Sequence, residues 1–493
     1  MTVMADRDGS ARSWTLHPDR ALPSDPGVRE IARRLHTATS TLPIVSMHGH
    51  VDAAMLADNL PFTDPASLLV TPDHYLVRML VSQASSPGAI RDAGVRSVAD
   101  LGVGPDGESD PREIWRRFCA GWEALRATPT RFWMEHVLID VFEAPVAPSP
   151  ATADELFDHI ADRLTWPEYR PRALFERFGI EILATTDPAT ATLSAHAQLA
   201  AEGWEGRVIP TFRPDPFLEP ARDDWRRLLG SLSESSGIDA HHYEGYLDAL
   251  RQRRRAFVAA GARASDHGHL SADMTPLADT DARRLFDEAL RGNHSPASAA
   301  AFTAHMLFQM AEMSSEDGLV LQLHPGVVRD HDRGTAARYG HDIGYDIPTT
   351  VEFTRSLRPV LEAFGHHPDF RMIVFTVDET VYSRELAPLA GVYPALRLGA
   401  PWWFLDAPDS MRRFREATVE TAGLRNTSGF VDDTRAFCSI PARHDLARRS
   451  DAGFLARLVA EHRLDIDEAV DAAADLAYRQ VKESYPEPVG AFR

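Results

Sequence analysis

The chain has 493 residues, of which 44% are hydrophobic and 25% charged, the composition of an ordinary globular protein with a large core. Its formal net charge of −20 argues against nucleic acid or an anionic membrane as a partner. No apolar run approaches the roughly 18 residues that a membrane-spanning helix needs. The basic run Arg251–Arg255 lies inside a helical pattern, so we interpret it as a solvated helix face rather than a binding patch.

Cysteine content and the first residues bear on the compartment. Two cysteines, Cys119 and Cys438, are too few for a disulfide framework in a chain of this length, which favours a reducing compartment. The opening MTVMADRDGSARSW lacks the apolar stretch of a signal peptide. We therefore expect a cytoplasmic protein.

Eight short runs rich in apolar and β-branched residues recur along the chain. They are too short for helices and lack strict alternation, which is typical of parallel strands covered on both faces. The predicted strands are Thr41–His48, Ile180–Thr186, Arg207–Phe212, Gly261–Ser265, Gly318–His324, Arg371–Val377, Ala395–Ala400 and Ser428–Asp432.

Helical patterns such as His242–Ala260 separate several of these strands. Eight strands alternating with helices predict an α/β protein with a closed (β/α)₈ barrel rather than an open sheet. The segment after the first strand is too long for one crossover, so we predict a helical insertion there. The expected parts are an N-terminal segment with the first strand (1–50), the insertion (51–178), strands two to eight (179–450) and C-terminal helices packed on the barrel (451–493).

Polar side chains follow nearly every predicted strand, at the end of the barrel where catalytic residues sit. A barrel has no structural need to gather such residues on one rim, so the pattern indicates a functional site. In chain order they are His48, His50, Asp187, Arg213, Asp215, Asp266, His267, His324, Asp378, Glu379, Trp402, Trp403, Asp433 and Arg435.

The first strand ends in two histidines that can share one cation. His48 and His50 are two residues apart, so in an extended strand both imidazoles point to the same side. Imidazole suits zinc and similar divalent metals, and a carboxylate adds a charge-neutralising ligand. An isolated pair of this kind is a weak signal, but together with His324 and Asp433 it predicts a divalent metal site.

Two arginines at strand ends suit an anionic small molecule. The guanidinium groups of Arg213 and Arg435 can each pair with a carboxylate through two hydrogen bonds. The alternative for these two arginines is a buried salt bridge, for example to Asp187 or Asp215.

Three further residues at the strand ends are candidates for substrate binding. Asp266 either serves the site or caps the helix that follows. Trp402 and Trp403 are either both core residues, or one of them faces the cavity. His267 is expected to be a capping or packing histidine.

The predicted insertion contains a short polar motif. Asp73, His74 and Tyr75 lie at a helix start after Pro72. The aspartate fits an N-cap. A histidine beside a tyrosine can also handle protons near a barrel mouth.

These residues resemble a known family, the uronate isomerases of the amidohydrolase superfamily. The similar motifs occur in the family's order and cover the chain from about residue 20 to 485. They are His48–His50, Asp58–Phe62, Asp73–Arg78, Thr185–Pro188, Thr211–Asp215, Arg263–Gly268, Gln322–His324, Trp402–Phe404 and Asp433–Arg435.

The resemblance implies a single-metal enzyme that interconverts D-glucuronate with D-fructuronate, or D-galacturonate with D-tagaturonate, through an enediol. The metal, Zn²⁺ or another divalent ion, would be held by His48, His50 and Asp433, with His324 adjacent or ligating. The resemblance also implies a small-molecule sugar acid as substrate, bound by His74, Tyr75, Arg213 and Arg435. Asp433 and Tyr75, with His74, are candidates for base and proton relay, and which of them is the base stays open. A homo-oligomer is compatible with helices outside a barrel.

The chain departs from the family's pattern in three loops. They are Pro325–Asp332, Val377–Thr380 and Gly399–Pro401. Because these loops line the predicted barrel mouth, they bear on substrate identity more than on the metal site.

Two other functions compete with the isomerase. One is a hydrolase or carboxy-lyase of the same superfamily, in which the metal activates a water. The fourth predicted strand offers neither the Lys nor the Glu that bridges two metals in such amide hydrolases, which disfavours a two-metal version. The other is a non-catalytic sugar-acid binder, against which the paired histidines and Asp433 count.

Overall fold

The computed structural model describes residues 14–85 and 94–488. The chain divides into two compact units. The first comprises Met1–Arg20, Pro61–Arg170 and Asp332–Gly344. The second comprises Ala21–Leu60, Pro171–His331 and Tyr345–Arg493, and it contains all the predicted strands.

The second unit is built on parallel strands that neighbour one another in chain order. One sheet runs β1 (Ile44–Ser46), β2 (Ile180–Ala184), β4 (Arg207–Ile209). In the other sheet, β3 and β5 continue β2 and β4 after short breaks. It runs β3 (Asp187–Pro188), β5 (Phe212–Arg213), β6 (Ala264–His267), β7 (Val320–Leu323), β10 (Met372–Val374), β11 (Leu396–Leu398).

The segment around residues 427–434 closes the barrel between the last strand and the first. The eighth predicted strand, Ser428–Asp432, has no regular strand assignment, but Thr427 forms a parallel bridge with Leu398 of β11. At its other end, the Asp433 amide donates to the His48 carbonyl at 3.1 Å. The predicted (β/α)₈ barrel is confirmed. Its eighth member is an irregular segment that leads directly into Asp433.

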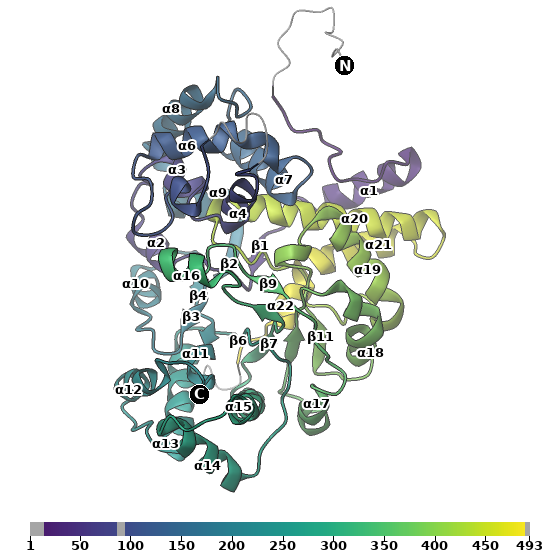
Figure 1. The fold of residues 1–493 in the computed structure, drawn as a ribbon. Helices are drawn as coiled ribbons and strands as arrows, with labels where there is room; N and C mark the ends of the chain where they lie inside the picture. The colour runs from purple at the N-terminus through teal and green to yellow at the C-terminus, as the bar shows by residue number, and fades with distance from the viewer. Residues whose placement is uncertain (1–13, 86–93, 489–493) are drawn as a thin grey trace, which may run out of the picture. The chain divides into compact units, whose positions relative to one another are not determined.

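Helices surround these strands in Figure 1 and bury their apolar faces against the sheet. They are α10 (Ser194–Glu202), α12 (Trp225–Ser236), α13 (Tyr243–Ala259), α14 (Asp279–Leu290), α15 (Pro296–Asp317), α17 (Arg358–Phe364), α18 (Ala387–Ala390) and α19 (Pro408–Ala422). The core between them is rich in aromatic residues, including Trp225, Tyr246, Phe257, Phe286 and Phe302.

Helices from the two ends of the second unit pack together. The N-terminal helix α1 (Pro26–Thr39) packs on α20 (Ile440–Ala460) and α21 (Ile466–Ala474). The last helix, α22 (Gln480–Ser484), follows the π-helical turn η9 (Asp475–Arg479). The first of these C-terminal helices thus starts at residue 440, earlier than the expected boundary at 451.

The basic run Arg251–Arg255 lies on α13, as its helical pattern predicts, but it is not simply a solvated face. Arg254 is 1% exposed and its guanidinium donates to both carboxylate oxygens of Asp317, at 2.6 and 2.9 Å. Arg253 donates to the carbonyls of Ala189 and Ala191. The interpretation of a wholly solvated run is therefore wrong, because two of these arginines hold neighbouring elements together.

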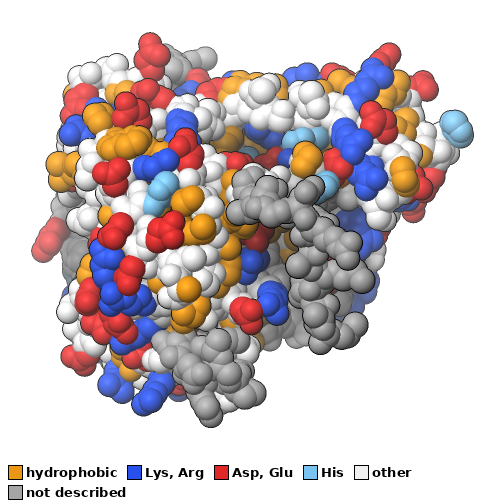
Figure 2. Space-filling view, turned by 90° about the horizontal axis from the view of Figure 1, so that it is seen from above, with side chains coloured by type: hydrophobic (Ala, Val, Ile, Leu, Met, Phe, Trp, Pro, Cys, Tyr) orange, Lys and Arg blue, Asp and Glu red, His pale blue; other side chains and the backbone are white. Residues whose placement is uncertain are grey.

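Acidic and basic side chains are mixed over the face of the molecule shown in Figure 2.

The described part of the first unit is helical. Its main helices are α3 (Pro65–Leu69), α4 (His74–Ser82), α6 (Pro111–Ala120), α7 (Pro129–His136), α8 (Ala153–Leu164) and α16 (Arg333–Tyr339). Aspartates cap the starts of α3, α4, α6 and α16 by accepting from backbone amides. The predicted insertion at 51–178 overlaps this unit, and its boundaries stay a prediction. The contribution of α16, from a separate stretch of chain, was not expected.

Over the ranges 14–85 and 94–488, none of the helices combines the length and the apolar character of a membrane-spanning segment.

A buried histidine of the barrel predicts a pH-dependent stability. Burial lowers the pKa of His305 in α15 from 6.5 to about 4. Its Nδ1 accepts from the Leu277 amide at 3.1 Å, and its Nε2 lies 2.6 Å from the Tyr243 hydroxyl. Because the folded-state pKa lies below the ordinary value, stability is full above about pH 6.5 and falls as the pH drops towards 4, by roughly 3 kcal/mol.

Replacing His305 by Gln removes this titration. Urea unfolding at a series of pH values should show a smaller loss of unfolding free energy between pH 7 and 4 for the variant than for the wild type. Equal slopes for the two proteins would contradict the assignment.

Candidate active site

The first strand and the closing segment are tied together where their side chains meet. The Asp433 amide donates to the His48 carbonyl, and the His50 amide donates to the Thr434 carbonyl at 3.0 Å. Asp433 has a φ of 41°, in the left-handed region that Asp enters more readily than most residues. Such strained backbone persists where the surroundings hold it, often at functional sites.

The side chains of His48, His50 and Asp433 converge on one point. Asp433 Oδ1 lies 3.3 Å from His48 Nε2 and 3.0 Å from His50 Nε2, and the three ligand atoms all lie within 4.8 Å of one another. A tetrahedral cation with ligands at about 2.1 Å separates them by about 3.4 Å. The cluster therefore has the spacing and the donor set of a divalent-metal site.

Gln322 of β7 sets the orientation of His48. The Gln322 amide nitrogen donates to the Tyr485 hydroxyl at 2.9 Å, which leaves its Oε1 to accept from His48 Nδ1 at 2.8 Å. In the neutral imidazole, His48 Nε2 then carries the lone pair. This atom is buried, lies 3.3 Å from Asp433 Oδ1 and forms no hydrogen bond with the described residues. An oriented imidazole with an orphaned nitrogen is what a metal ligand requires, so the residues present fit a cation.

The charges around His48 favour a positive charge at this point. Burial opposes the protonated form, but the carboxylates of Asp266 and Asp433 outweigh it and raise the pKa of His48 to about 9. Although burial acts in the opposite direction, the close imidazoles of His48 and His50 hold the pKa of Asp433 well below its usual range. Burial lowers the pKa of His50. A cation bound here would supply the positive charge that the two carboxylates favour.

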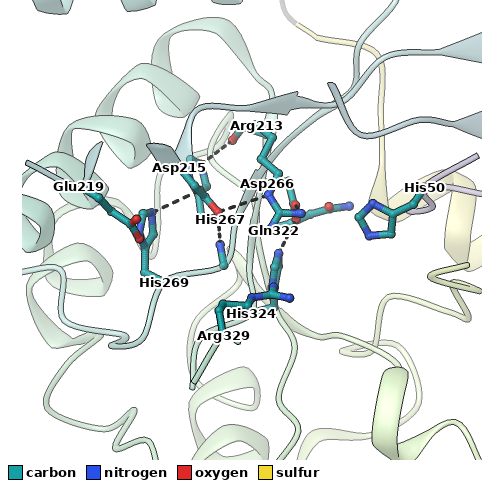
Figure 3. Close-up of polar contacts among 12 residues, drawn as sticks. His50, Arg213, Asp215, Glu219, Asp266, His267, His269, Gln322, His324 and Arg329 are labelled. Carbon is teal, nitrogen blue, oxygen red and sulfur yellow. Dashed lines mark hydrogen bonds and ion pairs between the residues drawn. The ribbon is translucent and has the colours of Figure 1, made fainter. Parts of the chain in front are cut away.

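Asp266 lies at the centre of the polar contacts drawn in Figure 3. It is fully buried, and its Oδ1 lies 3.0 Å from His324 Nε2 and 3.5 Å from His48 Nδ1. Its Oδ2 lies 3.4 Å from Arg213 Nη1. The alternative of a helix cap is wrong for Asp266, because the next helix begins only at Asp279. His324 contacts this carboxylate and is not one of the three clustered ligands.

Arg213 bridges two carboxylates. Besides its contact with Asp266, its Nε donates to Asp215 Oδ2 at 3.3 Å. The salt bridge considered from the sequence therefore forms with Asp215, whereas Asp187 accepts from the Thr185 hydroxyl. Arg435 lies two residues after Asp433 and is half-buried.

The two tryptophans play different structural parts. The Trp402 ring is buried, with its centroid 4.7 Å from that of His48 and 4.8 Å from that of His324. It forms an apolar wall against these imidazoles. Trp403 stacks on Phe404 and lies under the guanidinium of Arg329 at 4.9 Å.

His74 and Tyr75 belong to the first unit. Asp73 caps α4 by accepting from the Tyr75 and Leu76 amides, as expected. The rings of His74 and Tyr75 stack at 4.8 Å, and Tyr75 is buried. Their proposed role in proton transfer remains a prediction.

Some polar residues near the site were not assigned a role from the sequence. Gln322 lies two residues before His324 on β7, and this spacing could have drawn attention to it. His267 and His269 repeat the spacing of His48 and His50, but only the first pair was identified.

Imidazoles and a carboxylate gathered at the carboxyl ends of barrel strands are a donor set that suits a divalent cation, in the place where (β/α)₈ enzymes carry their active sites. The family model for glucuronate isomerase matches residues 28–485. A uronate isomerase of Xanthomonas oryzae is 51% identical over 474 residues, covering 96% of this chain and 98% of the relative. The chain belongs to the glucuronate isomerase family and is an isomerase, which confirms the resemblance noted from the motifs.

Solved structures give the same result. The crystal structure of glucuronate isomerase from Caulobacter crescentus matches with a TM-score of 0.92 and 46% identity, covering 96% of this chain and 97% of that one. Uronate isomerase from Thermotoga maritima matches with a TM-score of 0.87 and 27% identity, covering 96% and 100%.

The orientation of His48 by Gln322 yields a prediction about metal affinity. Replacing Gln322 by Leu removes the acceptor for His48 Nδ1, so the imidazole loses its fixed tautomer. The affinity of the His48 cluster for Zn²⁺, measured by competition with a chromogenic chelator, should fall about 10- to 100-fold. Gln322→Glu keeps an acceptor and is the control. A Leu variant with wild-type affinity would contradict this role.

Proposed function

We propose that the protein interconverts a hexuronate aldose with its ketose, D-glucuronate with D-fructuronate or D-galacturonate with D-tagaturonate. Family membership over nearly the whole chain supports the reaction. The observation that carries the residue assignment is the convergence of His48, His50 and Asp433 at the carboxyl end of the barrel, beside Arg213.

The reaction moves protons within one sugar. The open-chain aldose has an aldehyde at C1 and a hydrogen on C2. A base removes the C2 proton and the C1 oxygen takes up a proton, which gives a cis-enediol. C1 then receives a proton while the C2 hydroxyl loses one and becomes the ketone. Asp433 and Tyr75 are the candidates for base and relay, with His74 beside Tyr75.

His48, His50 and Asp433 would hold the metal, for which we propose Zn²⁺ because two imidazoles and one carboxylate suit it. When bound, the ion supplies positive charge beside the reacting carbons. His324 stays the proposed adjacent or ligating residue, and its Nε2 lies 3.0 Å from Asp266 Oδ1.

Arg213 and Arg435 are proposed to bind the C6 carboxylate. The guanidinium of Arg213 contacts Asp215 through Nε and Asp266 through Nη1. Its orientation is therefore fixed before the substrate binds. Asp266 positions Arg213 and His324. The indole of Trp402 keeps water from the inner side of the imidazoles. Trp403 is also proposed to contact the sugar. The guanidinium of Arg329 lies over its ring.

The three departing loops bear on the choice of uronate. In Pro325–Asp332, Arg329 pairs with Asp346 at 2.7 Å and lies over Trp403. These contacts give this loop a fixed arginine next to the proposed sugar site.

We propose a cytoplasmic location, because a reducing compartment suits the two free and buried cysteines.

A single experiment tests the function. Zinc-loaded protein is incubated with glucuronate or galacturonate in D₂O, and C1 and C2 are followed by NMR. We expect a ketose product with solvent deuterium exchanged at C2 or incorporated at C1. Chelation of the metal should abolish turnover, and Asp433→Asn should lower kcat about a thousandfold. Absence of ketose from both uronates would overturn the proposal.

Arg213 yields a separate prediction. Arg213→Lys keeps the charge but loses the two-pronged hydrogen bond, so KM for the uronate should rise about 10- to 100-fold. Steady-state kinetics measure it. Arg207→Lys, at an exposed pair with Glu487, is the control and should leave KM unchanged. An unchanged KM in Arg213→Lys would remove the residue from the substrate site.

A further inference from the structure

A second group of potential metal ligands lies beyond Arg213. It consists of Asp215, at the start of α11 (Asp215–Leu218), with His267 at the end of β6 and His269 two residues later. One ligand atom from each of the three lies within 4.8 Å of the others, and all three side chains are buried. In the proposed reaction Asp215 serves only to hold Arg213, and neither His267 nor His269 has a role.

Each of these three side chains has its other polar atom occupied. His267 Nε2 lies 3.2 Å from the Ser265 hydroxyl, and His269 Nδ1 lies 2.9 Å from Glu219 Oε1. Asp215 Oδ2 accepts from the Gly268 amide at 2.8 Å, in addition to Arg213.

The atoms that remain face one another. His267 Nδ1, His269 Nε2 and Asp215 Oδ1 are buried, and none has a hydrogen-bond partner within the described ranges. Asp215 Oδ1 lies 3.6 Å from the first and 3.3 Å from the second. These separations bracket the roughly 3.4 Å between ligands of a tetrahedral cation with bonds near 2.1 Å. Three orphaned ligand atoms at this spacing point to an ion between them.

The contacts behind the ligands have the form that metal sites use. A metal-binding histidine commonly donates its other N–H to a carboxylate, which fixes the tautomer and strengthens the ligand. His269 stands in this relation to Glu219. Figure 3 shows Glu219 and His269 on one side of Asp215 and Arg213 on the other.

A bound cation accounts for this arrangement better than hydrogen bonding within the group. His267 Nδ1, His269 Nε2 and Asp215 Oδ1 form no hydrogen bond with one another or with the rest of the described residues. Buried polar atoms are costly when they have no partner. A cation placed between them satisfies all three atoms together.

We propose that Asp215, His267 and His269 bind a second divalent transition-metal ion, of the zinc type, separate from the ion at His48, His50 and Asp433. Glu219 and Ser265 orient the two imidazoles. Three protein ligands leave one position for a water or another small ligand. The site bears on the substrate through Asp215, whose other oxygen holds Arg213, so the ion positions Arg213 rather than taking part in proton transfer.

The test counts metal ions. Chelator-stripped protein is equilibrated with Zn²⁺, passed through a desalting column, and measured by elemental analysis. The wild type should retain two equivalents, and His269→Leu should retain one. His305→Gln, which changes a buried histidine outside both clusters, should retain two. One equivalent in the wild type, or two in His269→Leu, would overturn the proposal.

A second variant covers the case in which His269→Leu does not fold, as judged by circular dichroism. His48→Ala/Asp433→Ala removes the first cluster and leaves the second intact. It should still retain one equivalent, and retention of none would overturn the second site. This count does not depend on isomerase activity, so failure of the proposed reaction and failure of this site are separate results.

The positioning of Arg213 has its own readout. In His269→Leu, KM for the uronate should rise several-fold while kcat changes little, because Arg213 is displaced and the His48 cluster is intact. A variant that loses one zinc equivalent but keeps the wild-type KM would overturn the link to Arg213.

Discussion

Buried carboxylates at the carboxyl ends of the barrel strands are the constraint on which the site depends. An ionised carboxylate away from water is costly unless positive charge or hydrogen-bond donors surround it. Asp433 is compensated by His48, Asp266 by His48 and Arg213, and Asp215 by Arg213. The chain of contacts is continuous, so each group's position depends on its neighbours. In each of the two ligand clusters, imidazole nitrogens and a carboxylate oxygen also lie close together at the spacing that suits a bound cation.

The barrel supplies the rigidity that this arrangement needs. Parallel strands bring residues from distant parts of the chain to one end, as when Gln322 of β7 reaches His48 after β1. The irregular closing segment carries Asp433 with a strained backbone, and hydrogen bonds to the end of β1 hold it there. A regular strand could not give Asp433 its positive φ. The irregular backbone of the eighth segment is therefore needed to direct this carboxylate towards His48 and His50.

Much of this could be predicted from the sequence because parallel strands place i and i+2 residues on one side and align their carboxyl ends. That rule was enough to predict that His48, His50 and Asp433 lie close together, and the resemblance to the family motifs predicted the reaction. It was not enough for Asp266, whose interpretation as a cap or a site residue depends on where the next helix begins. Nor could it find Arg254, because a buried guanidinium is recognised only once its partner Asp317 is placed. The group at Asp215, His267 and His269 depends on which atom of each side chain is already occupied, and only coordinates supply that.

The most direct test of the central claim is anomalous diffraction from crystals of the zinc-loaded protein. If buried carboxylates are compensated by a bound cation, the anomalous map at the zinc edge should show a peak about 2.1 Å from His48 Nε2, His50 Nε2 and Asp433 Oδ1. A map without a peak there, with Asp433 hydrogen-bonded directly to a protonated His48 instead, would contradict the account.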